Sequence, residues 1–272
     1  RLVAKPGDWL NGLAQIAKAM QEAGADMASV ATAIADVTVS DVARCIAASL
    51  MSGEKKAVLL GALAQNHPQA AQLHVLAQAI AAASGATLGF LSPAANGVGA
   101  QVVGVLPGPN GLGAQAMLDA PRSAYVLIGV EPELDAYDAG AATRAMRSAE
   151  FVVALSAFKT AAQDDADVLL PIAPFSETAG SFINMEGRLQ SFHGVVKPQG
   201  EARPAWKVLR VLGNLLSLGG FDYDTAEAVR ADAVQGDLAA ALNNAAADVG
   251  LTLNAASEGL ERVGETPLYQ LD

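Results

Sequence analysis

Residues 124–158, AYVLIGVEPELDAYDAGAATRAMRSAEFVVALSAF, contain two short apolar runs separated by a stretch with helical spacing. The runs 124–130 and 151–158 do not alternate with polar residues, which is typical of parallel strands covered on both faces. The segment 138–149 between them fits a helix. Short apolar strands separated by helices predict a doubly wound parallel sheet.

The same alternation extends in both directions along the chain. Toward the N-terminus we expect a strand in AVLLGALA (57–64), a helix over 68–83, strands over 86–91 and 101–106, and a short helix over 113–119. Toward the C-terminus we expect a short strand within 166–174 and an amphipathic helix over 206–218. Further helices fit 8–24, 40–52 and the region around 224–247. In 40–52 we expect Ser40 to cap the helix and Val42, Ile46, Leu50 and Met51 to face inward. The predicted fold class is α/β, with a Rossmann-like, doubly wound and mostly parallel sheet and helical flanks.

The domain organisation follows from this pattern. We expect an N-terminal helical segment over 1–36, a Rossmann-like domain over 37–220, and a helical or irregular segment over 221–272. The chain opens at Arg1 in mid-pattern, so we interpret it as a fragment of a longer polypeptide.

Composition limits the class of protein. The 272 residues are 52% hydrophobic, 5% aromatic and 17% charged, which excludes a disordered chain and predicts a core of alanine, valine and leucine. Residues 57–118 contain no Asp, Glu, Lys or Arg, but amides and glycines interrupt them too often for a membrane span, so we expect a buried block. A net charge of −11 argues against nucleic acid and anionic membrane surfaces as direct partners, and we expect no direct membrane insertion.

Metal and thiol chemistry have few candidates. The single cysteine, Cys45, excludes a disulfide framework and a cluster held by four thiolates of this chain, and we predict a buried structural thiol. The histidines, His67, His74 and His193, are too few and too scattered for a zinc site. The carboxylates of 164–167 fit a solvated turn.

GLGAQA (111–116) matches the GxGxxA pattern of dinucleotide sites, and Glu131 lies 20 residues beyond its first glycine. In such a site Gly111 and Gly113 would let the backbone approach a pyrophosphate, and Glu131 would hold ribose hydroxyls. However, residues 107–110 separate the motif from the preceding strand, and the following helix is only about two turns long. A tight turn is the alternative that the sequence favours.

The segment 166–192 is the richest in turn and polar signals. Prolines should end its strand, and Gly180 should permit a turn with positive φ. Residues 181–185 and 188–192 then fit a hairpin. We expect Glu177, Glu186 and Arg188 to form a bidentate ion pair that ties the preceding loop to this hairpin.

This segment, ADVLLPIAPFSETAGSFINMEGRLQSF, resembles the stretch shared by the molybdopterin oxidoreductase superfamily, with its pattern of strand, Pro, Glu-Thr, Gly, Asn, Glu-Gly-Arg and Gln. Within the superfamily, LLPIAPFSET is most similar to the family of large iron–sulfur subunits of bacterial NADH:quinone oxidoreductase, respiratory complex I. The segments 125–135, 202–216 and 263–272 resemble the same family. Weaker similarity covers nearly the whole chain.

The resemblance implies a domain without its own cofactor. Superfamily enzymes bind a molybdenum or tungsten pterin dinucleotide in the crevice of this domain, whereas the large iron–sulfur subunits of complex I have lost the metal and kept the fold. Their 4Fe-4S iron–sulfur clusters belong to an N-terminal region that this chain lacks. Related cofactor-binding enzymes often place Asn-Pro after the strand, but here Glu131-Pro132 follows Gly129, and a carboxylate would repel a phosphate.

We therefore expect no catalytic residue, no metal ligand and no cofactor in this chain. Glu177, Asn184 and Arg188 are interpreted as positions that stabilise the fold. Should a nucleotide or pterin site survive, the candidates would be Gly111, Gly113, Glu131, Glu177, Asn184 and Arg188.

The expected function is that of a structural part of proton-translocating NADH:quinone oxidoreductase, inactive alone. Its expected partners are other peripheral-arm subunits, on the cytoplasmic face of the bacterial inner membrane. One alternative is a molybdopterin-dependent oxidoreductase similar to formate dehydrogenase, with a functional Mo or W pterin site. Another is a dinucleotide-binding module that uses Gly111, Gly113 and Glu131.

Overall fold

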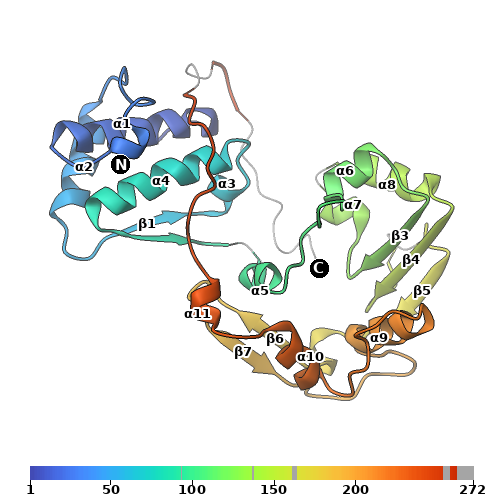
Figure 1. Ribbon diagram of the computed structural model, residues 1–272. Coiled ribbons are helices and arrows are strands. Elements are labelled where there is room, and N and C mark those ends of the chain that lie inside the picture. Colours follow the sequence, from blue (N-terminus) through green and yellow to red (C-terminus); the bar gives the residue numbers. More distant parts are fainter. Residues whose placement is uncertain (93, 137, 161–163, 254–257, 262–272) are drawn as a thin grey trace. The chain divides into compact units, whose positions relative to one another are not determined.

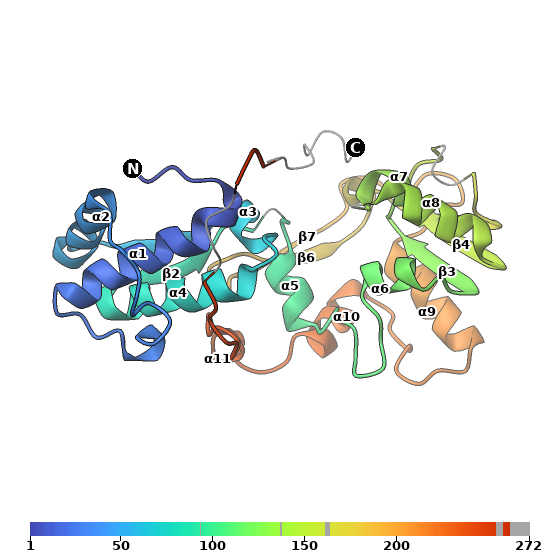
Figure 2. The same cartoon turned by 90° about the horizontal axis from the view of Figure 1, so that it is seen from above.

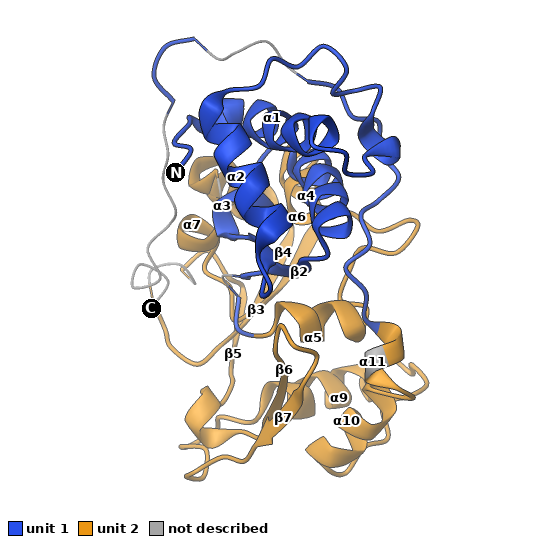
Figure 3. Cartoon of the chain, turned by 90° about the vertical axis from the view of Figure 1, so that its left-hand side faces the viewer, with its two compact units in different colours: residues 1–95, 242–265 blue, residues 96–241, 266–272 orange. Residues whose placement is uncertain are grey.

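The computed structural model is shown in Figure 1 and, turned by 90°, in Figure 2. It describes residues 1–92, 94–136, 138–160, 164–253 and 258–261. The chain divides into two compact units (Figure 3). Unit 1 comprises Arg1–Ala95 and Leu242–Glu265, and unit 2 comprises Asn96–Ala241 and Thr266–Asp272. These units have other bounds than the segments 1–36, 37–220 and 221–272, which rest on sequence pattern and stay a prediction.

Unit 1 is a small two-stranded parallel sheet with helices packed on it. Its elements are η1 (Pro6–Asp8), α1 (Trp9–Glu22), η2 (Ala28–Val30), α2 (Asp41–Ser52), β1 (Ala57–Leu60), α3 (Ala62–Gln65), α4 (Ala70–Ser84) and β2 (Thr87–Phe90). Strand β1 pairs with β2 from Ala57 opposite Thr87 to Leu60 opposite Phe90. Helix α1 lies against both α2 and α4 (Figure 1).

Small side chains set the packing of these helices. Ala14 and Ala17 of α1 and Ala43 and Ala47 of α2 are buried, and they leave room for larger side chains between the helices. The fully buried large side chains of this core include Leu10, Met20, Ile34, Leu73, Leu76 and Ile80.

Helix α2 presents a different face than its sequence suggested. It begins as expected, because the Ser40 hydroxyl accepts a hydrogen bond from the Ala43 N–H. The expectation that Val42 and Met51 face inward is wrong, since each is 38% exposed and the alanine face is buried instead. The prediction of a buried Cys45 is wrong for the same reason: the thiol lies off the alanine face and is exposed.

The neutral amides of the uncharged block hold backbone in place. Residues 242–253 return to unit 1 and lie along α4, where Gln78 Oε1 accepts from Ala246 N and Gln72 Oε1 accepts from Thr252 N. Gln65 Nε2 donates to Leu60 O and Leu91 O, at the ends of the two strands. The helix expected around 224–247 therefore stops earlier, because this stretch bonds to α4 rather than to itself.

Unit 2 contains a three-stranded parallel sheet and a separate hairpin. Its elements are α5 (Gly97–Val102), α6 (Ala114–Asp119), β3 (Ala124–Ile128), α7 (Pro132–Asp135), α8 (Ala139–Ser148), β4 (Phe151–Ser156), β5 (Val168–Pro171), η4 (Phe175–Glu177), β6 (Gly180–Ile183), β7 (Leu189–Phe192), α9 (Ala205–Leu215), α10 (Ala226–Ala233) and α11 (Leu238–Ala241). The sheet order is β3-β4-β5, and β6 pairs antiparallel with β7.

One face of the three-stranded sheet is covered by helices and the other is partly exposed. Tyr125 and Val152 are buried against Ala145 and Met146 of α8. The Tyr125 hydroxyl also donates to Met117 O of α6. On the opposite face Val126, Ile128 and Phe151 are exposed, whereas Leu155 is buried.

The α/β class with parallel strands is confirmed, but two local expectations are wrong. Residues 101–106 are not a strand: α5 runs to Val102, and Gly104 turns the chain with a φ of 71°. In AVLLGALA the strand ends at Leu60, and helix α3 follows. The described strands lie in three separate sheets, β1-β2, β3-β4-β5 and β6-β7.

The uncharged block is also not buried throughout. Its first half contributes Leu73, Leu76 and Ile80 to the core of unit 1, but residues 103–116 are exposed, with Val105 at 70%. Absence of charge thus did not predict burial. Among the described residues, none of the helices combines the length and apolar content needed to cross a bilayer.

Candidate functional site

The glycines of the GxGxxA motif lie in an exposed loop ahead of a short helix. Gly111 N donates to Gly108 O, and a Cβ at Gly111 would lie 2.9 Å from Gly108 N, so this glycine serves a tight turn. Gly113 is the residue before α6, which has only six residues. The strand expected before the motif is helix α5 and a turn, so the motif lacks the strand–turn–helix setting of a dinucleotide site.

Glu131 lies beyond the carboxyl end of β3, after Gly129, whose φ is 59°. Its carboxylate accepts a hydrogen bond from the Thr160 hydroxyl, and its N–H donates to Asp135 Oδ2 at 2.7 Å. Asp138 Oδ1 accepts from Ala141 N and caps α8. Carboxylates therefore occupy the helix starts that follow β3.

Asn184 builds the turn of the β6–β7 hairpin. Its Oδ1 accepts hydrogen bonds from Glu186 N at 3.0 Å and Arg188 N at 2.9 Å. Gly187 N donates to Asn184 O, and Gly187 adopts a φ of 78°, so the positive φ falls here. The expected positive-φ turn at Gly180 is wrong. That glycine is required by packing, because its Cβ would lie 2.4 Å from the Phe192 ring.

The expected ion pair between Glu177 and Arg188 is absent from the interactions of these two side chains. Arg188 Nη2 lies 3.9 Å from Glu186 Oε2, and both side chains are exposed. Glu177 Oε2 instead accepts a hydrogen bond from Gln199 N at 3.2 Å. The bidentate ion pair expected among Glu177, Glu186 and Arg188 is therefore not formed.

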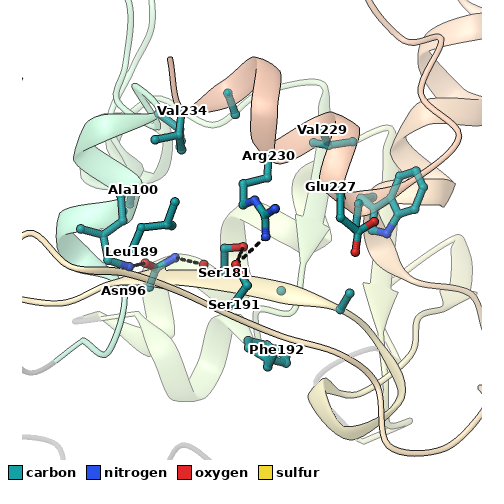
Figure 4. Close-up of a pocket in the computed structure, with 18 of the residues that line it drawn as sticks. Asn96, Ala100, Ser181, Leu189, Ser191, Phe192, Glu227, Val229, Arg230 and Val234 are labelled. Atoms are coloured by element: carbon teal, nitrogen blue, oxygen red, sulfur yellow. Dashed lines mark hydrogen bonds between the residues drawn. The ribbon is translucent and has the colours of Figure 1, made fainter. Parts of the chain in front are cut away.

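The structure shows a cavity that the sequence did not predict, beside this hairpin in unit 2 (Figure 4). Its volume is about 360 Å³. Alternation along the strands places the cross-strand pairs Ser181–Ser191 and Ile183–Leu189 on its floor. Phe182 and Phe192, on the other hairpin face, form an edge-to-face pair at 5.5 Å. Helix α10 covers the cavity and α5 forms one side.

Asn96 fixes α5 to the edge of the hairpin. Its Oδ1 accepts from Ile183 N at 2.9 Å and its Nδ2 donates to Ser181 O at 3.4 Å, as a further strand would. Gly99 makes this possible, because a Cβ there would lie 2.1 Å from Asn96 Oδ1. The side-chain amide thus satisfies backbone groups at an otherwise open strand edge.

Polar groups gather on the side of the cavity formed by α10 and β7. Arg230 Nη1 donates to Ser191 Oγ at 2.6 Å, and the Ser181 and Ser191 hydroxyls are 2.9 Å apart (Figure 4). Glu227 Oε1 lies 3.7 Å from His193 Nδ1. The pKa of Glu227 is lowered, first by a hydrogen bond from its own backbone N–H and further by Thr225 and the charges of His193 and Arg230.

Part of this site could have been found in the sequence. The alternating pattern of 180–192 places both serines on one face of the predicted hairpin. Arg230 carries no such signal, because it lies about 40 residues further along and reaches Ser191 only through the tertiary fold.

Residues 8–215 match the protein family described as molybdopterin oxidoreductase, which covers most of the chain. The chain belongs to the molybdopterin oxidoreductase family. Among the described residues of this family member, no group of three or more His, Cys, Asp or Glu side chains could hold a metal ion.

Several Staphylococcus aureus proteins resemble part of this molybdopterin oxidoreductase chain. The protein named "Putative formate dehydrogenase" in strain bovine RF122 / ET3-1 is 38% identical over 80 residues, which are 29% of this chain and 8% of the relative. Its counterpart in strain MRSA252 is 36% identical over the same shares. The matched part is thus less than a tenth of these curated relatives.

The sheet edge of unit 2 does not fit the phosphates of a pterin dinucleotide. Such a group needs free backbone N–H groups at a helix start. After β3 the Glu131 and Ala141 N–H groups are bonded to the carboxylates of Asp135 and Asp138. A pyrophosphate there would meet negative charge in place of donors.

Proposed function

We propose that this chain is a structural part of a larger oxidoreductase, of the NADH:quinone oxidoreductase type. It supports the cluster-bearing region and neighbouring peripheral-arm subunits on the cytoplasmic face of the bacterial inner membrane. In this proposal it holds no cofactor, carries no catalytic residue and is inactive alone. The iron–sulfur clusters belong to another part of the parent chain.

The observation that carries the proposal is how the motif side chains are used. Asn184 bonds two backbone N–H groups of its own turn, and Glu177 bonds Gln199 N. A side chain that holds a cofactor directs its polar atoms at the ligand. Asn184 Oδ1 and Glu177 Oε2 instead accept hydrogen bonds from the backbone of this chain. The carboxylates at the end of β3 support the same conclusion.

The test is metal and pterin analysis of the purified full-length protein. The proposal predicts iron and sulfide from clusters, but no stoichiometric molybdenum, tungsten or pterin. Stoichiometric Mo or W with pterin would overturn it and favour the second candidate, a formate dehydrogenase-like enzyme. That candidate is supported by the names of the S. aureus relatives.

A nucleotide titration tests the remaining alternative. The proposal predicts no saturable binding of NAD or NADH to the 272-residue chain below millimolar concentration. Sub-millimolar binding that Gly113→Val abolishes would show a dinucleotide site at Gly111, Gly113 and Glu131.

A further inference from the structure

The cavity between α10 and the β6–β7 hairpin is lined by the positively charged side chain of Arg230, which the proposed structural role does not use. Among the described residues, Ser191 is the one hydrogen-bond partner of the Arg230 side chain. A guanidinium has five N–H donors, so most of them remain available to a ligand. The Ser181 and Ser191 hydroxyls lie beside it and can each donate or accept.

The rest of the lining is largely apolar. Ile183 and Leu189 come from the hairpin, and Val103 and Val105 from the chain after α5. Val229 comes from α10 and Val234 directly follows this helix, and Figure 4 shows Val234 and Leu189 on the far side of the cavity from Glu227. A volume of about 360 Å³ lies at the lower end of the roughly 300–1,000 Å³ of small-molecule sites.

The charges restrict the kind of anion that fits. Arg230 supplies a positive charge, and Glu227, one turn earlier on α10, supplies a negative charge that faces His193. A single carboxylate can pair with the fork of Arg230. A phosphate dianion or a nucleotide would bring further negative charge near Glu227.

We propose that this cavity binds an amphipathic monocarboxylate. Its carboxylate pairs with Arg230 and the Ser181 and Ser191 hydroxyls, and its apolar body lies along Ile183, Leu189 and Val234. This inference goes beyond the structural role and does not depend on the metal or pterin content of the parent protein.

The experiment is isothermal titration of the 272-residue chain with octanoate, below its micelle-forming concentration. We expect saturable binding of one octanoate per chain. We expect 1-octanol, with the same apolar body and no charge, to bind at least about tenfold more weakly, because a hydrogen-bonded charge is lost. Adenosine monophosphate should not bind in the same range.

Variants locate the site. Arg230→Gln should weaken octanoate binding about tenfold or more and leave 1-octanol binding unchanged, which also shows that the cavity is intact. Arg144→Gln, an exposed arginine on α8, is the matched control and should change neither. Val234→Trp fills the apolar end and should reduce binding of both compounds.

Three results would overturn the inference. They are the absence of saturable octanoate binding, equal affinity for octanoate and 1-octanol, and unchanged octanoate affinity in Arg230→Gln. Should Arg230→Gln not fold, retained octanoate binding in folded Val234→Trp would contradict the site equally.

Discussion

Each of the two units of the chain is stabilised by a different kind of interaction. In unit 1, α1, α2 and α4 enclose a continuous cluster of buried apolar side chains, and neutral amides bind the surrounding backbone. In unit 2 the buried cluster is small and the sheet leaves Val126, Ile128 and Phe151 exposed. Side-chain hydrogen bonds from Asn96 and Asn184 shape the hairpin instead. Core packing therefore dominates the stability of unit 1, and local polar contacts fix the geometry of unit 2.

The largest expected effect lies in the core of unit 1. Leu76→Ala removes a fully buried side chain from α4 and should lower the free energy of unfolding by about 3 kcal/mol, because it leaves a cavity. Val126→Ala on the open face of β3 should cost about 0.5 kcal/mol or less, since Val126 is 54% exposed. Urea denaturation followed by circular dichroism measures both. Equal losses at the two positions would remove the contrast between the units.

A second prediction concerns the hydrogen bonds of unit 2. Asn96→Ala removes both bonds to β6 and leaves Ile183 N without its partner, so the free energy of unfolding should fall by about 1–2 kcal/mol. Asn110→Ala, in the exposed loop before α6, is the control and should change stability by less than about 0.5 kcal/mol. A loss no larger than that of the control would show that this amide does not hold α5 to the hairpin.

Gly99→Ala tests the same contact of the Asn96 side-chain amide by a substitution within α5. Alanine is favoured in a helix by about 1 kcal/mol, but its Cβ would displace the Asn96 side chain, so we expect a net loss of about 1 kcal/mol. In the Asn96→Ala background the clash is gone, and Gly99→Ala should become stabilising. A double-mutant cycle measured by denaturation tests this change of sign. The same effect of Gly99→Ala in both backgrounds would refute the contact.

The smallest effect is a dependence on pH. The pKa of Glu227 is lowered in the folded chain from its ordinary value of 4.5, so the unfolded chain binds this proton more tightly. Its stabilisation is therefore complete above about pH 4.5 and is lost as the pH falls through the lowered folded value. The Tm deficit of Glu227→Gln should be small at pH 7 and should shrink as the pH is lowered below about 4.5. A Tm deficit of Glu227→Gln that grows on acidification would contradict the prediction.

Much of the local structure could be predicted from the sequence, because local signals determine it. Ser40 starts α2, the apolar runs form β3 and β4, and the hairpin turns at 184–187. The strand predicted over 101–106 was wrong, since an apolar run of that length fits a strand or a helix end equally well. The prediction of which face of α2 points inward was wrong, because tight helix packing selects alanine over valine.

The candidate site was less predictable than the fold. Its hairpin face follows from alternation, whereas Arg230 meets Ser191 only after α10 has packed. The motif residues were correctly located on the hairpin and the preceding loop, but the ion pair among them was not formed, since Asn184 rather than Arg188 organises the turn.

Asn184→Ala in the full-length oxidoreductase separates a structural role of the motif from a chemical one, provided that Tm and turnover per mole of folded protein are measured together. We expect a lower Tm, because the Glu186 and Arg188 N–H groups lose their acceptor, and unchanged turnover per folded molecule. An unchanged Tm with a large loss of turnover would contradict the structural role and place Asn184 in the chemistry of the enzyme.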